Sequence, residues 1–544
     1  MTTASDPVDE KKHAINEKAT AAGSETDTTS PESTTVGAER ERADDLDDAF
    51  KYLHDHADAG VESTSINLVA LRRKIDWRIV PIMFACYVLQ FLDKVVINYA
   101  AVMGINKDLG LTKNNFTNVG SAFFIAYLIA EVPTGYILQK IPPGKWLGIN
   151  VCLWGVSCAA SAGATNYPSL LASRVFVGMF EAAIAPCLML ISSQYYTKSE
   201  QAPRFAIWYC GLGKSEQAPR FAIWYCGLGV GQILGGLVSF AFQHVTNRSF
   251  KSWQAMFVFI GIATALVGIA TFFILPDSPM KAKWLSEPEK AALLKHVSVN
   301  QTGIQNKHFK VGQALEVLSD VQLWLMTICT ICISVSSGVI TTYSATLIQS
   351  FGFTPQRTAL LNMPSGVVSI AAALIVGFGV RHSSNRWAWL ALCCIPGMIG
   401  GGLMSFMPPN NRAALLVGIY LVNAITGTLT VIYQWTMANV SGHTKRSVAA
   451  ALIAGSFSIG NIIGPQTFQA RDAPAYRPAK IAVMASQGGG AVVAIVLFGY
   501  YVWVNKQKDK RQAIAGGPAS AAGDEKILWE NLTDKENPNF RYVY

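Results

Sequence analysis

Four charged residues stand inside apolar stretches of this sequence. Asp93 and Lys94 lie midway along WRIVPIMFACYVLQFLDKVVINYAAV, and Arg174 and Glu181 lie within SLLASRVFVGMFEAAIAPCLMLISSQYY. The second pair is spaced by two helical turns, which places both side chains on one face of a helix. Ionisable residues within membrane helices are costly, and they mark substrate or proton pathways or pair with one another. We therefore predict that Asp93 and Glu181 carry protons, and that Lys94 and Arg174 bind an anionic substrate.

The same four residues also allow a structural interpretation, in which Asp93–Arg174 or Lys94–Glu181 pairs only tie two helices together. Burial makes a carboxyl group hold its proton more tightly, and a nearby cation has the opposite effect. In the first interpretation, substrate arrival and proton release are therefore coupled; in the second they are unrelated. Glu131 is a third acid in an apolar stretch. It either belongs to the same pathway or contacts the loop that follows its helix.

Polar residues in other apolar stretches are weaker candidates. Each of them either faces a cavity or forms hydrogen bonds between helices, because polar side chains in membrane helices do both. These candidate substrate-binding residues are Tyr127, Tyr343, Asn362, Asn423, Gln434 and Asn461.

The cysteines and histidines show no metal-binding spacing. All ten cysteines lie in apolar stretches, and no second ligand pair accompanies Cys329 and Cys332. Packed thiols are the expected state of such residues. We predict no metal site and no cofactor.

The candidate residues require a membrane-spanning frame. Of the 544 residues, 51% are hydrophobic and only 15% are charged. The apolar residues form runs of about twenty, enough for a helix to cross the hydrocarbon core. We predict an all-α polytopic membrane protein with about twelve transmembrane helices in two six-helix halves. The predicted spans are 78–102, 117–139, 144–164, 169–195, 220–243, 254–275, 322–348, 358–380, 387–407, 413–437, 447–468 and 480–504.

Polar segments flank and separate the two sets of spans. Residues 1–76 are predicted to be a disordered tail, 276–320 a linker between the 77–275 and 321–505 bundles, and 506–544 a second tail. Lysine and arginine gather in the tails, the linker and one set of loops, so both termini are predicted to be cytoplasmic. The polar start contains no signal peptide, so the first span is expected to direct insertion. The net charge of +9 reflects this bias, and no nucleic-acid partner is expected.

A perfect repeat interrupts the first set of spans. Residues 198–213 and 214–229 both read KSEQAPRFAIWYCGLG. The apolar end of the first copy is too short to span, and continuing through Lys214 would place a charge in the bilayer at about 2.5–3.5 kcal/mol. We predict that the second copy begins the fifth span. The junction GLGKS is no phosphate-binding loop, because Trp208 stands where that motif requires glycine. We interpret the repeat as a recent duplication or a sequence error.

Six spans, a linker and six spans match the pattern of the major facilitator superfamily. More specifically, the chain resembles the anion:cation symporter family, in its fungal allantoate permease group, from about residue 75 to the end. Two departures stand out: Lys94 replaces an arginine that is frequent in relatives, and Gln139 replaces the aspartate of the usual loop motif after the second span. The matching segments are LDKVVINYA, SRVFVGMFEAAIAPCLMLISSQYY, LPDSPMKAKWLSEPEKAAL, NVSGHTKRSVAAA, NIIGPQTF and LTDKENPNFRYVY.

The resemblance implies a proton-coupled symporter of a small organic anion, working by alternating access as a plasma-membrane monomer without enzymatic activity. Allantoate, ureidosuccinate or a dipeptide-like compound is expected, and a vitamin or an amino acid is the alternative. The resemblance also implies proton coupling at Asp93 and Glu181, and anion binding with gating at Arg174. Lys94 keeps the charge but loses the two-pronged geometry of arginine. A nutrient sensor of the same fold and a metabolite exporter remain alternatives.

Overall fold

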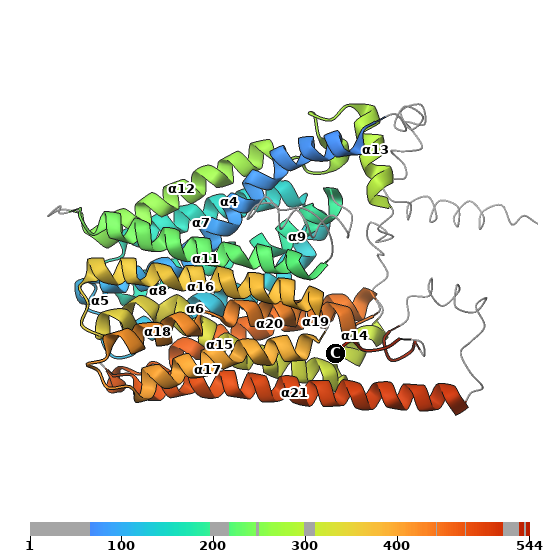
Figure 1. The fold of residues 1–544 in the computed structure, drawn as a ribbon. Coiled ribbons are helices and arrows are strands. Elements are labelled where there is room, and N and C mark those ends of the chain that lie inside the picture. The colour runs from blue at the N-terminus through green and yellow to red at the C-terminus, as the bar shows by residue number, and fades with distance from the viewer. Residues whose placement is uncertain are drawn as a thin grey trace, which may run out of the picture. The chain divides into compact units, whose positions relative to one another are not determined.

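The computed structural model describes residues 66–195, 217–245, 250–298, 311–383, 385–441, 443–473, 475–514, 533–537 and 540–544. All of them lie in one compact unit, His56–Tyr544. Within these ranges the regular elements are α-helices and short 3-10 helices, with no strand, which confirms the all-α prediction (Figure 1). The first copy of the repeat lies outside the described residues.

The first half of the structure contains the helices before the linker. Its fifth span, α11, begins inside the second copy of the repeat. The helices are α4 (Leu68–Val102), α5 (Ile105–Asp108), α6 (Asn115–Lys140), α7 (Pro143–Ala160), α8 (Tyr167–Glu181), α9 (Ile184–Tyr195), α11 (Gln217–Phe242) and α12 (Ser252–Ile274), with the 3-10 turn η2 (Ser161–Gly163).

The second half follows two short helices and a 3-10 turn of the linker, which are η3 (Pro279–Lys281), α13 (Glu287–Ser298) and α14 (Val311–Leu318). Eleven segments of the described residues are long and apolar enough to cross a membrane, and the shorter apolar stretch Gly227–Phe242 of α11 stands at the fifth predicted span. The helices are α15 (Val321–Ser350), α16 (Pro355–His382), α17 (Arg386–Phe406), α18 (Arg412–Val422), α19 (Ile425–Asn439), α20 (His443–Gln466) and α21 (Arg477–Ile514), with the 3-10 turn η4 (Ala470–Asp472).

The fourth span of each half is broken, which corrects the prediction of continuous helices at 169–195 and 413–437. In the first half, α8 ends at Glu181 and α9 begins at Ile184. Pro186 has no N–H group to donate to the carbonyl one turn earlier, so the helix is interrupted there. In the second half, the carbonyl of Asn423 between α18 and α19 accepts hydrogen bonds from the hydroxyls of Ser369 and Thr426.

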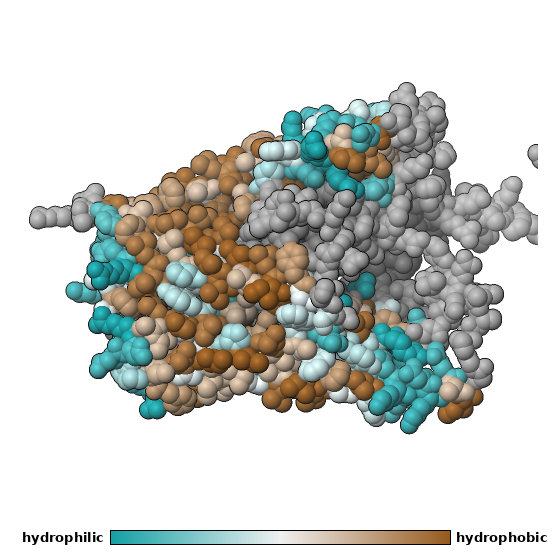
Figure 2. Space-filling model, in the orientation of Figure 1, coloured by the Kyte–Doolittle hydropathy of each residue, from teal (hydrophilic) through white to brown (hydrophobic). Residues whose placement is uncertain are grey.

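Apolar side chains cover the middle of the face in Figure 2, and hydrophilic residues gather at its ends. Some apolar residues are among the most exposed: Val132 is 78% exposed and Phe273 is 79% exposed. Continuous exposed apolar surface of this extent is unfavourable in water. It is the expected surface of helices that face lipid.

Two glycines bring the halves into backbone contact. A Cβ atom added to Gly229 on α11 would lie 2.4 Å from the carbonyl oxygen of Gly366 on α16, and one added to Gly366 would lie 2.3 Å from that of Gly229. Any side chain at either position would collide with main chain. We call this pair the glycine seam.

Hydrogen bonds join the halves at the helix ends that border residues 103–114 and 467–476. They connect α4 and the start of α6 to the end of α15 and to the residues after α20. We call them the inter-half bridges: Asn98 Nδ2 to Ser344 Oγ at 2.8 Å, Thr117 Oγ1 with Tyr343 OH at 2.7 Å, and Asn114 Nδ2 to Gln469 Oε1 at 2.6 Å.

Candidate functional site

The four charged residues form two ion pairs between α4 and α8. Lys94 Nζ lies 2.5 Å from Glu181 Oε1, and Arg174 Nη1 lies 3.4 Å from Asp93 Oδ2. Asp93, Glu181 and Arg174 are buried, whereas the Lys94 side chain is 14% exposed. Both pairs named in the structural interpretation are therefore present in this conformation, and each joins one acidic and one basic side chain.

Each pair leaves hydrogen-bonding capacity unused. Glu181 Oε2 and Arg174 Nε have no hydrogen-bond partner among the described atoms. The Cys158 thiol, from α7, donates to Asp93 Oδ1 at 2.9 Å. Breaking a buried ion pair by removing one partner is costly, because the remaining charge stays buried. The two unused atoms belong to buried side chains that do not line the cavity described below.

Helix α6 supplies aromatic rings to this network. The Lys94 ammonium lies 5.4 Å from the centre of the Tyr127 ring, and the Arg174 guanidinium lies 5.2 Å from the centre of Phe123. These rings attract cations through their negative faces. Gly178 permits this approach, because a Cβ there would lie 2.3 Å from the Phe123 carbonyl oxygen. The glycine between Arg174 and Glu181 thus sets the distance between α6 and α8.

A cavity of about 390 Å³ lies between the two halves. Of the four charged residues in the network, Lys94 lines it, and Glu131 is its second charged lining residue in the part of the chain that the structure describes. The second half contributes neutral side chains. Lining residues with polar or aromatic side chains include Tyr87, Gln90, Phe91, Phe124, Tyr127 and Gln232 from the first half, and Ser337, Thr341, Ser369, Asn423, Thr426, Tyr433, Phe457 and Asn461 from the second.

The two breaks in the fourth spans border this cavity. Ala185 and Pro186, at the start of α9, line it on one side, and Asn423 and Thr426 line it on the other. Interrupted helices at corresponding positions of two transporter halves mark the substrate site, because their free backbone groups bind ligands. The breaks therefore make the cavity a candidate substrate site, independently of its charges.

The predicted candidates divide into two groups. Lys94, Tyr127, Asn423 and Asn461 line the cavity, and Tyr343, Asn362 and Gln434 do not. Tyr343 belongs to the inter-half bridges and stacks on Phe468 with ring centres 4.3 Å apart. Asn362 donates to Tyr99 OH and Ser344 Oγ, and Gln434 is buried.

Arg174 does not line the cavity in this conformation, and its predicted role in anion binding stays a prediction. Tyr87 and Gln90 were missed, although their spacing from Lys94 repeats every three to four residues, as expected for one face of a helix. That spacing was the signal that could have revealed them.

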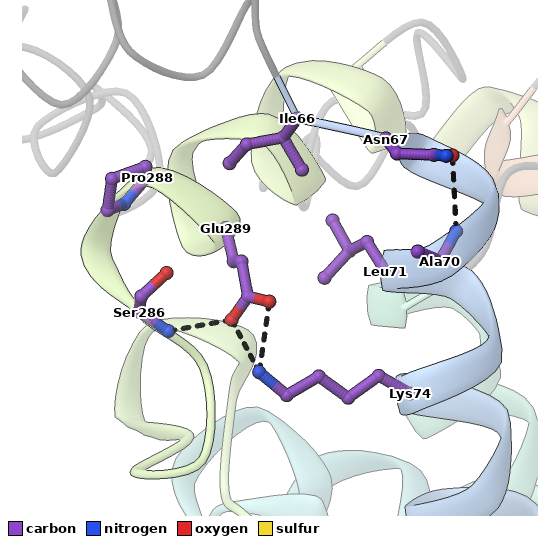
Figure 3. Close-up of a pocket in the computed structure, with 8 residues that line it drawn as sticks. All are labelled: Ile66, Asn67, Ala70, Leu71, Lys74, Ser286, Pro288 and Glu289. Carbon is purple, nitrogen blue, oxygen red and sulfur yellow. Dashed lines mark hydrogen bonds and ion pairs between the residues drawn. The ribbon is translucent and has the colours of Figure 1, made fainter.

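A second hollow, of about 570 Å³, lies where the start of α4 meets the linker (Figure 3). Lys74 Nζ lies 2.7 Å from Glu289 Oε2, which also accepts a hydrogen bond from the Ser286 amide. Burial alone would raise the pKa of Glu289, but the hydrogen bonds and charge of Lys74 and the Ser286 amide outweigh burial and hold this pKa below its usual value. The Lys74–Glu289 ion pair beside this hollow connects α4 to α13.

Three carboxylates converge at the start of the second half. Oxygens of Glu316, Asp320 and Asp534 lie within 4.8 Å of one another. The buried Lys445 ammonium lies 2.9, 2.6 and 2.7 Å from them, respectively. We call these four residues the acid cluster. A lysine ammonium occupies the position that a metal ion would need.

The segment 540–544 packs against the second half. Val543 N donates to Asn439 Oδ1 of α19 at 2.7 Å, and its carbonyl accepts from Trp435 Nε1 at 2.8 Å. Tyr542 N donates to Asn505 Oδ1 of α21 at 3.0 Å. The predicted tail 506–544 therefore begins as helix, since α21 continues to Ile514, and its far end is bound by side chains of α19 and α21.

Comparison with known proteins decides the family. Residues 83–465 match the family model described as Major Facilitator Superfamily. The chain belongs to this superfamily. It is 36% identical to the Thiamine pathway transporter THI73 of Saccharomyces cerevisiae over 87% of this chain and 86% of that protein. It is 30% identical to the allantoate permease of the same yeast over 92% and 91%.

Solved structures of superfamily members share the fold. The proton:xylose symporter XylE superposes with a TM-score of 0.60 at 16% identity, over 79% of this chain and 96% of that one. An inward-facing bacterial homologue of the lysosomal transporter Spinster gives 0.57 at 15% identity, over 78% and 96%. These matches confirm the predicted fold class and family. The chain is a multi-pass membrane protein whose relatives are transporters.

Proposed function

We propose that this protein is a symporter that moves a small organic anion together with protons by alternating access. One observation carries the proposal: Lys94 lines the cavity while its ammonium is bound to the buried Glu181 carboxylate. An anion entering the cavity competes with Glu181 for this cation. A buried carboxylate that loses its cation is strongly disfavoured in its charged form. Glu181 therefore takes up a proton as the anion takes Lys94.

Proton and anion binding are then reciprocally linked. A proton on Glu181 frees Lys94 and so strengthens anion binding, and the bound anion strengthens proton binding by the same factor. Release reverses the exchange, because Lys94 returns to Glu181 as the proton leaves. The Asp93–Arg174 pair is the second proton-dependent contact in this proposal. Protonation of Asp93 releases Arg174, which loosens α4 from α8 and contributes to gating.

The conformation supports alternating access. The inter-half bridges close the helix ends beside residues 103–114 and 467–476, and the cavity lies between the halves. In the orientation expected from the lysine and arginine bias, with both termini cytoplasmic, these bridges close the outer side. Opening toward the outside requires them to break. We assign the protein to the plasma membrane in this proposal.

The cavity suits a small, amide-bearing carboxylate. Asn423, Asn461 and Gln90 supply neutral donors and acceptors around Lys94, and a volume of about 390 Å³ suits a compact ligand. Allantoate and ureidosuccinate combine a carboxylate with ureido groups of this kind. The name of the relative called allantoate permease is consistent with an anionic substrate. The name of the thiamine pathway transporter is the reason to include vitamins among the substrates tested.

Uptake by transporter-deficient yeast tests the proposal. Labelled allantoate, ureidosuccinate, a dipeptide, nicotinate, pantothenate and cysteine are offered at acidic and neutral external pH, with and without a protonophore. We expect acid-stimulated, protonophore-sensitive uptake of at least one of them. If the protein is present at the surface and none enters, the proposal fails. Efflux from preloaded cells would then favour an exporter, and binding without movement would favour a sensor.

A further inference from the structure

Glu131 is a charged residue of the cavity that the proposed cycle does not use. It lies in the span Asn115–Leu138, nine residues before Lys140 at the end of α6. No described residue donates a hydrogen bond to its carboxylate or pairs with it in an ion pair. A charged acid at membrane depth costs about 2.5–3.5 kcal/mol on insertion scales. A position this costly and this accessible suits a group that meets a ligand.

Its place relative to Lys94 follows from helix geometry. Tyr127, whose ring centre lies 5.4 Å from the Lys94 ammonium, precedes Glu131 by four residues on the same face of α6. Four residues rise about 6 Å along a helix. The two charges therefore line one cavity from α4 and α6, and their separation along the axis of α6 is about one turn.

The second-half side of the cavity is neutral, so the charges of Lys94 and Glu131 determine which charged ligands fit. The second-half residues that line the cavity carry no charge in the described part of the chain, so a ligand meets one cation and one anion, both on the first half. A ligand with only a carboxylate pairs with Lys94 and leaves the Glu131 carboxylate, about one turn away, without a partner. Electrostatic complementarity favours ligands that match both charges. A ligand that also carries a cationic amine satisfies both residues.

We propose that Glu131 is a specificity-determining residue that selects substrates bearing a cationic amino group several bonds from their carboxylate. Lys94 binds the carboxylate and Glu131 binds the amine, and the aromatic rings of Tyr127 and Tyr433 line the space that the substrate backbone occupies. The one-turn offset fits the charge separation of a dipeptide or an ω-amino acid better than the adjacent groups of an α-amino acid. This inference rests on the proposed function, because Lys94 must accept the substrate carboxylate.

A matched pair of probes tests the inference in the full-length protein. Labelled alanyl-alanine carries both charges, and N-acetyl-alanyl-alanine keeps the carboxylate but lacks the amine. We expect wild-type uptake of the free dipeptide to exceed that of the acetylated form. In Glu131→Gln, the ratio of free to acetylated uptake falls by about tenfold or more, the worth of one charge-assisted hydrogen bond. Glu131→Asp retains the charge and keeps a ratio above that of Glu131→Gln.

Surface labelling and thermal unfolding of each variant show that the change in ratio does not come from misfolding, since a folding defect lowers both uptakes together. Equal ratios in wild type and Glu131→Gln overturn the inference. So does wild-type uptake of the acetylated dipeptide as fast as the free one, or no uptake of either probe. The proposed function fails separately, when no compound of the anion panel shows acid-stimulated uptake.

Discussion

Replacing Lys445 with methionine removes the ammonium that holds the acid cluster together. Methionine has a similar length and fills the buried space, so the main loss is charge. At 4.8 Å and an effective dielectric constant of about 20, two carboxylates repel by about 3.5 kcal/mol. Protonation of one carboxylate relieves part of this repulsion. We therefore expect Lys445→Met to lower the free energy of unfolding by about 3–5 kcal/mol, the usual cost of breaking a buried pair.

The same change should create a calcium site. Three carboxylate oxygens within 4.8 Å of one another can each reach a shared Ca²⁺ at about 2.3–2.6 Å. The assay is thermal unfolding of purified full-length protein in detergent, followed by tryptophan fluorescence with Ca²⁺ or with a chelator. We expect Lys445→Met to unfold several degrees below wild type in chelator. Calcium should restore part of the difference, because a ligand that binds only the folded state stabilises it.

Lys535→Met is the matched control. Its ammonium lies 3.7 Å from Asp320 Oδ1 and its side chain is 38% exposed, so the change should cost no more than about 1 kcal/mol. An unchanged unfolding midpoint for Lys445→Met would refute the reasoning. Equal stabilisation of wild type and Lys445→Met by calcium would refute the idea that the ammonium occupies the cation position.

Three further changes probe other parts of the molecule. Glu181→Gln should abolish accumulation driven by a proton gradient while substrate exchange continues, and normal acid-driven accumulation would reject its coupling role. Gly178→Ala should cost about 1–3 kcal/mol by overpacking and lower uptake, whereas Gly163→Ala, where a Cβ meets nothing within 4 Å, should match wild type in uptake and stability. Because the pKa of Glu289 is lowered, its pair with Lys74 is intact above the usual carboxyl range and is lost as pH falls through the lowered value. Hydrogen exchange in α13 should therefore rise on strong acidification, and Lys74→Met should remove that pH dependence.

The charged network was accessible from sequence because charges within apolar runs are rare and costly. Both ion pairs named from the sequence are present. The sequence could not show which partner faces the cavity. Asp93 and Lys94 are neighbours, so their side chains point about 100° apart around the helix. Which of them is buried depends on how α4 is rotated against α7 and α8, a property of the packed bundle.

The two helix breaks differ in how visible they are. Pro186 is a sequence signal for the first break, because proline removes a backbone donor. The sequence prediction nevertheless treated that span as continuous. Asn423 stands at the second without a proline or a charge nearby. Its carbonyl is satisfied by the Ser369 hydroxyl from α16, a contact between residues far apart in the chain. The local contact from the Thr426 hydroxyl contributes as well, but the contact from Ser369 leaves no signal in the local sequence.

Lys445 illustrates the same limit. Because Lys445 is a charged residue next to a predicted span, the sequence predicts that it lies in a loop. Loop lysines and arginines were then used to predict the orientation of the protein in the membrane. The structure buries this lysine among carboxylates from the linker, the start of α15 and the segment after α21. A count of charges along the chain cannot distinguish a solvated lysine from one neutralised by distant partners. The orientation itself stays a prediction.

In the proposed alternating-access cycle, the glycine seam has a consequence for the rate at which the halves reorient. At Gly229 and Gly366 the two main chains approach each other without a Cβ atom between them, and the side chains of Ile370 and Ile233 flank the contact. Larger side chains at these two positions would interdigitate and add an activation barrier to each reorientation. Glycine avoids this added barrier. The exchange between the two conformations is then faster, and the substrate affinity of each conformation is unchanged. The turnover number, more than substrate recognition, is then the property that these two glycines protect.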